Sequence, residues 1–261
     1  MEALTNEVIA WLKDNGANLV GISPVERFDG ALKGHHPSDF VSKAKTVVAF
    51  GVALLHYALH WEKHLANSEI VPPENRKDVL MKLLYLETGY AKVNDLLDML
   101  ALRVANSLEG RGYRSLFFPA TYRSESVEFM RARIPSFFGL FSQRHAAVMA
   151  GLGEFGLNNV VVTPEYGPRI RFNSVITEAE LIPNALISQK VCLGESCSLC
   201  IKNCPGAISL RPGFDPQAVW YVPPSCTYLK ACCLKLHPVH YCMGRCIKVC
   251  PVGNRRPGDS A

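Results

Sequence analysis

The chain has 261 residues, of which 48% are hydrophobic and 20% charged, ordinary values for a soluble globular protein with one large domain or a domain and a small appendage. The formal net charge of +5 is modest and its charges are scattered without blocks of like sign, so the charge does not argue for nucleic-acid binding. The longest apolar run, Thr46 to Leu55, is too short to span a bilayer, so we expect no membrane association. Because the N-terminus has neither a basic region nor a twin arginine, we expect a cytoplasmic protein.

Expected helices and strands alternate over the first part of the chain. The expected helices cover about residues 5–15 (capped by Thr5), 39–45, 73–108 (with Gly89 as a candidate break), 125–133 and 143–150. The expected strands cover 18–23, 46–55, 113–119, 159–163 and 170–177, the last two as a hairpin across 164–168. The pattern predicts an α/β (α+β) layered domain over residues 1–186, followed by a small loop-rich domain over 187–261.

All ten cysteines lie between Cys192 and Cys250, and the first 191 residues have none. In a cytoplasmic chain, clustered cysteines more often bind metal than form disulfides. Two cysteine runs each end in a cysteine followed by proline, at Cys204-Pro205 and at Cys250-Pro251. This pattern is typical of bacterial ferredoxins with two 4Fe–4S clusters, in which the cysteine before proline ligates the cluster opposite to the rest of its run.

We therefore expect two cross-paired sets of cluster ligands. The first set is Cys192, Cys197, Cys200 and Cys250, and the second is Cys204, Cys226, Cys242 and Cys246. Two spacings depart from the usual two intervening residues. Four residues separate Cys192 from Cys197, with Gly194 at the expected cysteine position, and three separate Cys242 from Cys246.

Two cysteines, Cys232 and Cys233, fall outside both sets. They are interpreted as buried small hydrophobic residues, and the alternative is that one of them replaces Cys226 or Cys242 as a ligand. Structural zinc is the alternative for the whole region, although zinc favours paired Cys-x-x-Cys motifs and two Cys–Pro endings are unusual for it.

A glycine-rich segment, Gly151-Leu-Gly-Glu-Phe-Gly156, precedes the cysteines. In a dinucleotide-binding unit such glycines follow a strand and open a helix, whereas here they follow an expected helix and precede an expected strand. The segment therefore does not indicate nicotinamide binding. Glycines at a helix end still permit a flat ligand to approach the backbone closely.

The chain contains the segments Ala150-Gly-Leu-Gly-Glu154, Thr163-Pro-Glu-Tyr-Gly-Pro-Arg169 with Arg171, and Val175-Ile-Thr177, followed by the cysteines and by Cys226-Thr-Tyr-Leu229. In these segments it resembles cobalamin- and iron–sulfur-dependent reductases, namely reductive dehalogenases and epoxyqueuosine reductase. The resemblance covers most of the chain, and it is specific from residue 147 onward and diffuse before it. The resemblance implies a nitroreductase-like layered domain that binds cobalamin and a ferredoxin-like domain with two 4Fe–4S clusters. It also implies corrinoid-binding positions at Gly151, Gly153, Asn158, Arg169 and Arg171.

The expected catalytic acid of epoxyqueuosine reductase has no counterpart here, because Phe137 occupies its aligned position. Reductive dehalogenases use a tyrosine as proton donor, so Tyr122 and Tyr166 are candidates, and His145 is a candidate acid–base group. The chain stops soon after Cys250, without the helical extension that would hold tRNA, so tRNA is not an expected partner.

The sequence predicts an iron–sulfur oxidoreductase that passes electrons through two clusters to cobalamin and reduces an unidentified substrate or a corrinoid. The alternatives are a corrinoid-free, ferredoxin-like electron-transfer protein for a partner enzyme, and a flavin-dependent reductase. The expected partners are a low-potential electron donor such as ferredoxin or flavodoxin, a small-molecule or corrinoid substrate, and a second copy of the chain in a homodimer.

Overall fold

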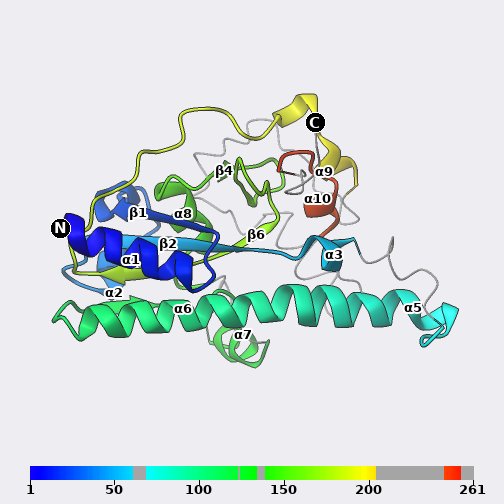
Figure 1. Cartoon of the computed structure of the whole chain (residues 1–261), viewed down its shortest axis with the longest axis horizontal. Helices are drawn as coiled ribbons and strands as arrows, with labels where there is room; N and C mark the ends of the chain where they lie inside the picture. Colours follow the sequence, from blue (N-terminus) through cyan, green and yellow to red (C-terminus); the bar gives the residue numbers. More distant parts are fainter. Residues whose placement is uncertain (61–68, 123, 134–138, 204–243, 254–261) are drawn as a thin grey trace.

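An antiparallel sheet of four strands lies at the centre of the fold, with helices on both faces (Figure 1). The computed structural model describes residues 1–60, 69–122, 124–133, 139–203 and 244–253. The strands are β1 (Leu19–Pro24), β2 (Thr46–Ala53), β6 (Ile170–Thr177) and β3 (Ser115–Phe117), named in their spatial order. A separate pair joins β4 (Glu154–Phe155) to β5 (Val161–Val162).

Helices make up most of the remaining regular structure of the described ranges. The α-helices are α1 (Glu2–Asp14), α2 (Pro37–Phe40), α3 (His56–Leu59), α5 (Pro73–Leu80), α6 (Lys92–Glu109), α7 (Ser124–Arg131), α8 (Gln143–Met149), α9 (Leu199–Lys202) and α10 (Arg245–Lys248). Two short 3₁₀ segments are η1 (Val25–Phe28) and η3 (Gly194–Ser196), and η2 (Met81–Ala91) is π-helical. No helix in these ranges is both long and apolar enough to cross a membrane.

One long helix runs along the sheet, because α5, η2 and α6 follow each other without a break (Figure 1). This confirms the single helix expected from the periodic apolar residues. Gly89 does not break it but lies within the π-helical segment, where a Cβ atom would come within 3.2 Å of the Cβ of Ala58 in α3. The glycine therefore allows α3 to approach the long helix.

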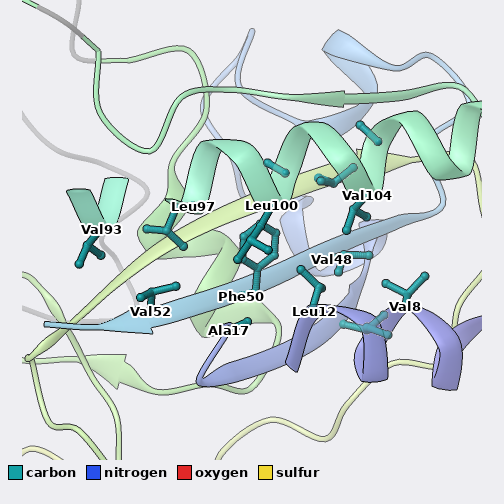
Figure 2. Packing of buried hydrophobic residues seen from close by; sticks show 14 of the residues in the cluster. Val8, Leu12, Ala17, Val48, Phe50, Val52, Val93, Leu97, Leu100 and Val104 are labelled. Carbon is teal, nitrogen blue, oxygen red and sulfur yellow. The ribbon is translucent and has the colours of Figure 1, made fainter. Parts of the chain in front are cut away.

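Strand β2 is buried on both faces, as its continuous apolar sequence predicts. Because side chains alternate along a strand, Val48 and Phe50 pack against α1 and α6, whereas Val47 and Ala49 pack against α8. Figure 2 shows Phe50 beneath the side chains that α6 directs at the sheet. The two apolar layers fix the sheet between the long helix and the segment that leads into the glycines.

The expected hairpin between residues 159–163 and 170–177 is wrong. Strand β6 instead lies between β2 and β3, pairing Thr46 with Thr177 and Ala53 with Ile170, while β5 pairs with β4. The turn chemistry of 164–168 does form a tight turn, in which the amide of Thr163 donates to the carbonyl of Gly167. The largely buried β6 has neighbours on both edges and cover on both faces, which a two-stranded hairpin would not provide.

Thr5 does not cap the first helix, which begins three residues earlier at Glu2. Thr5 is buried, and its hydroxyl donates to the carbonyl of Met1 and accepts the amide of Ile182. Thr5 was expected to cap the first helix, but its hydroxyl instead links that helix to the irregular segment after β6. The expected division of the chain after residue 186 stays a prediction.

Candidate functional site

Four cysteines line one pocket of about 350 Å³, counting the part that is open to solvent. Cys192, Cys197 and Cys200 come from the first cysteine run, and Cys250 comes from the end of the second. The rest of the lining is mostly apolar and comprises Leu157, Asn158, Val162, Leu193, Gly194, Ser198, Leu199, Pro251 and Val252. The structure thus brings together the four cysteines that were predicted as the first ligand set.

The irregular spacing of the first run has a local structural explanation. Between Cys192 and Cys197 the chain forms the 3₁₀ turn η3, and Gly194 opens it with a φ of 65°, in the left-handed region that favours glycine. Ser198 also has a positive φ and directs the chain into α9, which carries Cys200. The two extra residues are therefore taken up by a turn, and Cys192 reaches the same pocket as its neighbours.

The thiols of the pocket influence one another. Burial, together with the neighbouring Cys192 and Cys250, raises the pKa of Cys200 to about 11. Burial also raises the pKa of Cys250, against the opposite effect of the nearby Arg169 guanidinium. These thiols are protonated at neutral pH without metal, so binding a metal group as thiolates would release protons.

Glu154 in β4 fixes the backbone at the first cysteine. Its Oε1 atom accepts the amide of Val191 at 2.9 Å and the amide of Cys192 at 2.5 Å. Hydrogen bonds to a charged acceptor are stronger than those between neutral groups. The carboxylate therefore holds the beginning of the cysteine segment against the two-stranded sheet.

Arg169, directly before β6, holds the other end of the pocket. Its Nη1 donates to the carbonyl of Val252 at 2.7 Å, and its Nη2 donates to the carbonyls of Lys248, at 3.3 Å, and of Cys250. Arg169 is only 4% exposed. Burial lowers the pKa of Arg169, while the nearby Cys250 opposes that shift.

Two glycines let the segment after Cys250 approach the turn before β6. A Cβ atom at Gly167 would overlap the carbonyl oxygen of Val252, and one at Gly253 would overlap the backbone of Tyr166 and Gly167. Both glycines have positive φ angles, of 54° and 62°. A larger residue at either position would push the two loops apart.

The second predicted ligand set is described only at Cys246, which is buried in α10. Cys204, Cys226 and Cys242, together with Cys232 and Cys233, lie outside the described residues. Gly244, which precedes α10, lies against Tyr85 of the π-helical segment, whose hydroxyl would be 2.7 Å from a Cβ atom there. Within the described ranges, no three His, Cys, Asp or Glu side chains form a site for a single metal ion.

The predicted corrinoid glycines lie after α8 and before β4, in the order that the sequence indicated. A Cβ atom at Gly151 would overlap the carbonyl oxygen of Ala185, and one at Gly153 would lie 2.6 Å from that of Val162. The chain's own backbone thus occupies the space beside both glycines. Asn158 is buried and lines the cysteine pocket, where its Oδ1 accepts the amide of Val160.

Arg171 lies in a different setting from Arg169, because it is part of β6 and contacts residues of the long helix, whereas Arg169 precedes the strand and contacts the segment around Cys250. Its Nε donates to Asn94 at 3.1 Å, its Nη2 donates to the Thr121 hydroxyl at 2.6 Å, and its guanidinium lies 4.3 Å from the ring centre of Tyr90. The next residue on this face, Asn173, donates to Asp98. A polar strip therefore crosses the otherwise apolar layer between β6 and the helix.

The three candidate proton donors each lie in their own surroundings. His145 is buried in α8, with Nδ1 2.6 Å from the hydroxyl oxygen of Ser142 and its ring 4.9 Å from that of Phe155. Tyr122 is half-buried beside Leu140, and burial raises its pKa. Tyr166 lies in the turn that contacts Gly253. Phe137 is outside the described residues.

Sequence reasoning missed Glu154 and the role of the turn at Gly167. Glu154 is the only ionisable residue in the glycine-rich segment, so an isolated acid in an apolar segment was the available signal. Arg169 was identified as a functional residue, but its partners lie about 80 residues away and could not be read from its neighbours.

No protein-family model matches the chain. Its fold is that of epoxyqueuosine reductase and of reductive dehalogenases, which confirms the expected resemblance at the level of fold. The structure of epoxyqueuosine reductase from Streptococcus thermophilus matches with a TM-score of 0.54 and 17% identity, over 96% of this chain and 66% of that one. A catabolic reductive dehalogenase in complex with 3-bromo-4-hydroxybenzoic acid matches with a TM-score of 0.57 and 17% identity, over 95% and 31%.

Curated relatives match over a shorter stretch. The tetrachloroethene reductive dehalogenase of Sulfurospirillum multivorans is 37% identical over 73 residues, which make up 28% of this chain and 15% of that protein. The enzyme of the same name from Desulfitobacterium hafniense is 44% identical over 61 residues, or 23% and 10%. The matches thus span a small part of these relatives' length.

Proposed function

We propose that this chain is an iron–sulfur oxidoreductase that passes electrons through two 4Fe–4S clusters to a bound cobalamin and so reduces a small molecule or a corrinoid. The observation that carries the proposal is the pocket lined by Cys192, Cys197, Cys200 and Cys250. It combines three cysteines of one run with the Cys–Pro cysteine of the other, as cross-paired clusters require.

The residues of this pocket fit a 4Fe–4S cluster. Four thiols surround a space whose walls are mainly apolar, and such burial and the hydrogen bonds around the sulfurs tune a cluster's potential. Bound clusters would supply transfer of single electrons at low potential. We propose Cys204, Cys226, Cys242 and Cys246 for the second cluster, of which Cys246 is buried in α10.

The residues fit cobalamin in part. Arg171, with Tyr90 and Thr121 beside it, offers a guanidinium that suits the amide or phosphate edge of a corrinoid, and Asn158 offers an amide at the cysteine pocket. Gly151 and Gly153, in contrast, lie against the chain's own backbone at Ala185 and Val162. Bound cobalamin would supply a metal centre that accepts electrons from the clusters and delivers them to the substrate.

Anaerobic reconstitution tests the proposal directly. The purified chain should take up about eight iron and eight sulfide ions, as two 4Fe–4S clusters require. Cys250→Ser should lose cluster content, whereas the matched variant Cys233→Ser, at a cysteine outside both predicted sets, should keep it. A colourless protein that carries zinc would contradict the cluster assignment.

Titration with cobalamin then separates the candidate functions. The proposal requires a shift of the visible cobalamin spectrum at concentrations up to tens of micromolar, about −6 kcal/mol of binding free energy. Full redox activity of the clusters without cobalamin binding would favour a corrinoid-free electron-transfer protein. A yellow protein that releases flavin on heating would favour a flavin-dependent reductase. A ferredoxin or flavodoxin is the proposed electron donor for each assay.

A further inference from the structure

Arg169 is a buried cation that joins two distant parts of the chain, and we infer that it positions Cys250 as a cluster ligand and supplies the counter-charge of that cluster. The second half of the inference rests on the proposed function, because it requires a bound cluster. The first half concerns the protein alone. Both halves follow from the partners of Arg169 and from its burial.

The guanidinium donates hydrogen bonds to three backbone carbonyl groups of one short segment. These carbonyls belong to Lys248, Cys250 and Val252, at alternate positions around the end of α10. Since an arginine presents its donors in a rigid planar fork, the contacts fix the path of the chain through Cys250. Cys250 is thereby placed in the pocket of a cysteine run that begins 58 residues earlier, at Cys192.

The arginine is itself held by the central sheet. Its carbonyl accepts the amide of Leu54 at 2.8 Å, and β6 begins at the next residue and pairs with β2 and β3. Gly167 and Gly253 allow the two loops to touch backbone to backbone beside it. The position of Cys250 is therefore set by the sheet and not by the cysteine segment alone.

The positive charge of Arg169 has no anionic side chain paired with it among the described residues. Its guanidinium donates to three neutral carbonyls, and its Nε is buried without a hydrogen-bond partner within the described ranges. A buried charge without a counter-charge is strongly unfavourable. A 4Fe–4S cluster with four thiolates carries a net charge of about −2 in its oxidised form, and it would supply the missing negative charge.

The experiment compares Arg169→Gln and Arg169→Lys with Arg27→Gln and Arg27→Lys. Arg27 is a matched control, because it also donates to two distant backbone carbonyls, those of Met149 and Asn184, away from the cysteines. Thermal melts of all four variants identify any general loss of stability. The lysine variants keep the charge but lose the planar fork.

The first measurement uses metal-free protein and maps cysteine alkylation by mass spectrometry. Arg169→Lys keeps a positive charge beside the Cys250 thiol but loses the fork of hydrogen bonds, so it should speed alkylation of Cys250 about tenfold or more, with less than about a twofold change at Cys192. The Arg27 variants should change neither rate. An unchanged rate at Cys250, or equal increases at both cysteines, would overturn the positioning role.

The second measurement uses reconstituted protein. In Arg169→Gln, part of the cluster at Cys250 should show the electron paramagnetic resonance signal of a three-iron cluster. The fraction of that same cluster that keeps four irons should have a more negative potential, because a nearby positive charge favours the reduced form. Arg169→Lys should keep the wild-type potential while showing the three-iron signal. Equal potentials in wild type and Arg169→Gln would overturn the counter-charge role. If wild-type protein takes up no clusters, the proposed function fails, and alkylation of Cys250 still decides the positioning role.

Discussion

Replacing Glu154 by alanine should release the backbone at the beginning of the cysteine segment. The Oε1 atom accepts the amides of Val191 and Cys192 at 2.9 and 2.5 Å, and each hydrogen bond to a charged group contributes about 1.5–3 kcal/mol. Since both contacts are only partly buried, water recovers some of this energy, and we expect local opening to become easier by about 2–4 kcal/mol. Glu154→Gln keeps an acceptor oxygen and should lose only about 1 kcal/mol.

Amide hydrogen exchange in metal-free protein measures this opening at single residues. Exchange at Val191 and Cys192 should accelerate about 30- to 1,000-fold in Glu154→Ala and about fivefold in Glu154→Gln. Glu178→Ala is the control, because Glu178 also accepts a distant backbone amide, that of Arg114, but lies away from the cysteines. Unchanged exchange in Glu154→Ala, or equal acceleration in the glutamine variant, would refute the assigned role.

Three further predictions concern the framework around the site. Leu97→Ala should lower the free energy of unfolding by about 2–5 kcal/mol in urea denaturation, because Leu97 is fully buried in the layer between α6 and β2, and a loss below about 1 kcal/mol would contradict this packing. Gly151→Ala should lower it by at least about 2 kcal/mol, because φ is 74° and the added Cβ would overlap the Ala185 carbonyl; near-wild-type stability would show that the loop relaxes freely. Burial raises the pKa of Asp98 above the usual carboxyl value, so its contribution to stability is present below that value and is lost as the pH rises through the native pKa. Asp98→Asn should remove this part of the pH dependence above the usual carboxyl pKa of 3.8, measured by urea midpoints, and identical pH profiles would refute it.

Much of the fold could be predicted from local patterns. The apolar run of β2 and the three- and four-residue periodicity of the long helix each identified an element correctly, because burial on both faces, or on one helical face, leaves a direct trace in the sequence. The hairpin failed for a different reason. The turn at 164–168 is local and was read correctly, but the neighbours of β6 are strands formed by residues 46–53 and 115–117.

The candidate site divides in the same way. The ferredoxin pattern predicted one set of four cysteine ligands, and in the structure these four cysteines line one pocket. The metal that they would bind stays part of the proposal. The supporting residues were not predictable, because Glu154 and Arg169 act on backbone groups far along the chain. Backbone groups have no sequence signature, so only the structure could identify these contacts.

The pocket also has a consequence for chain entropy. A group bound by both Cys200 and Cys250 would close the intervening chain into a ring of about 50 residues, and on the chain-entropy model such a crosslink stabilises the folded state by about 4 kcal/mol. Bound metal would then crosslink the C-terminal part of the chain as well as serve as a redox centre. Removing the metal with a chelator should therefore lower the free energy of unfolding by more than the loss of the metal–sulfur bonds alone would, because the crosslink is lost as well. Reducing agents alone should leave the free energy of unfolding unchanged.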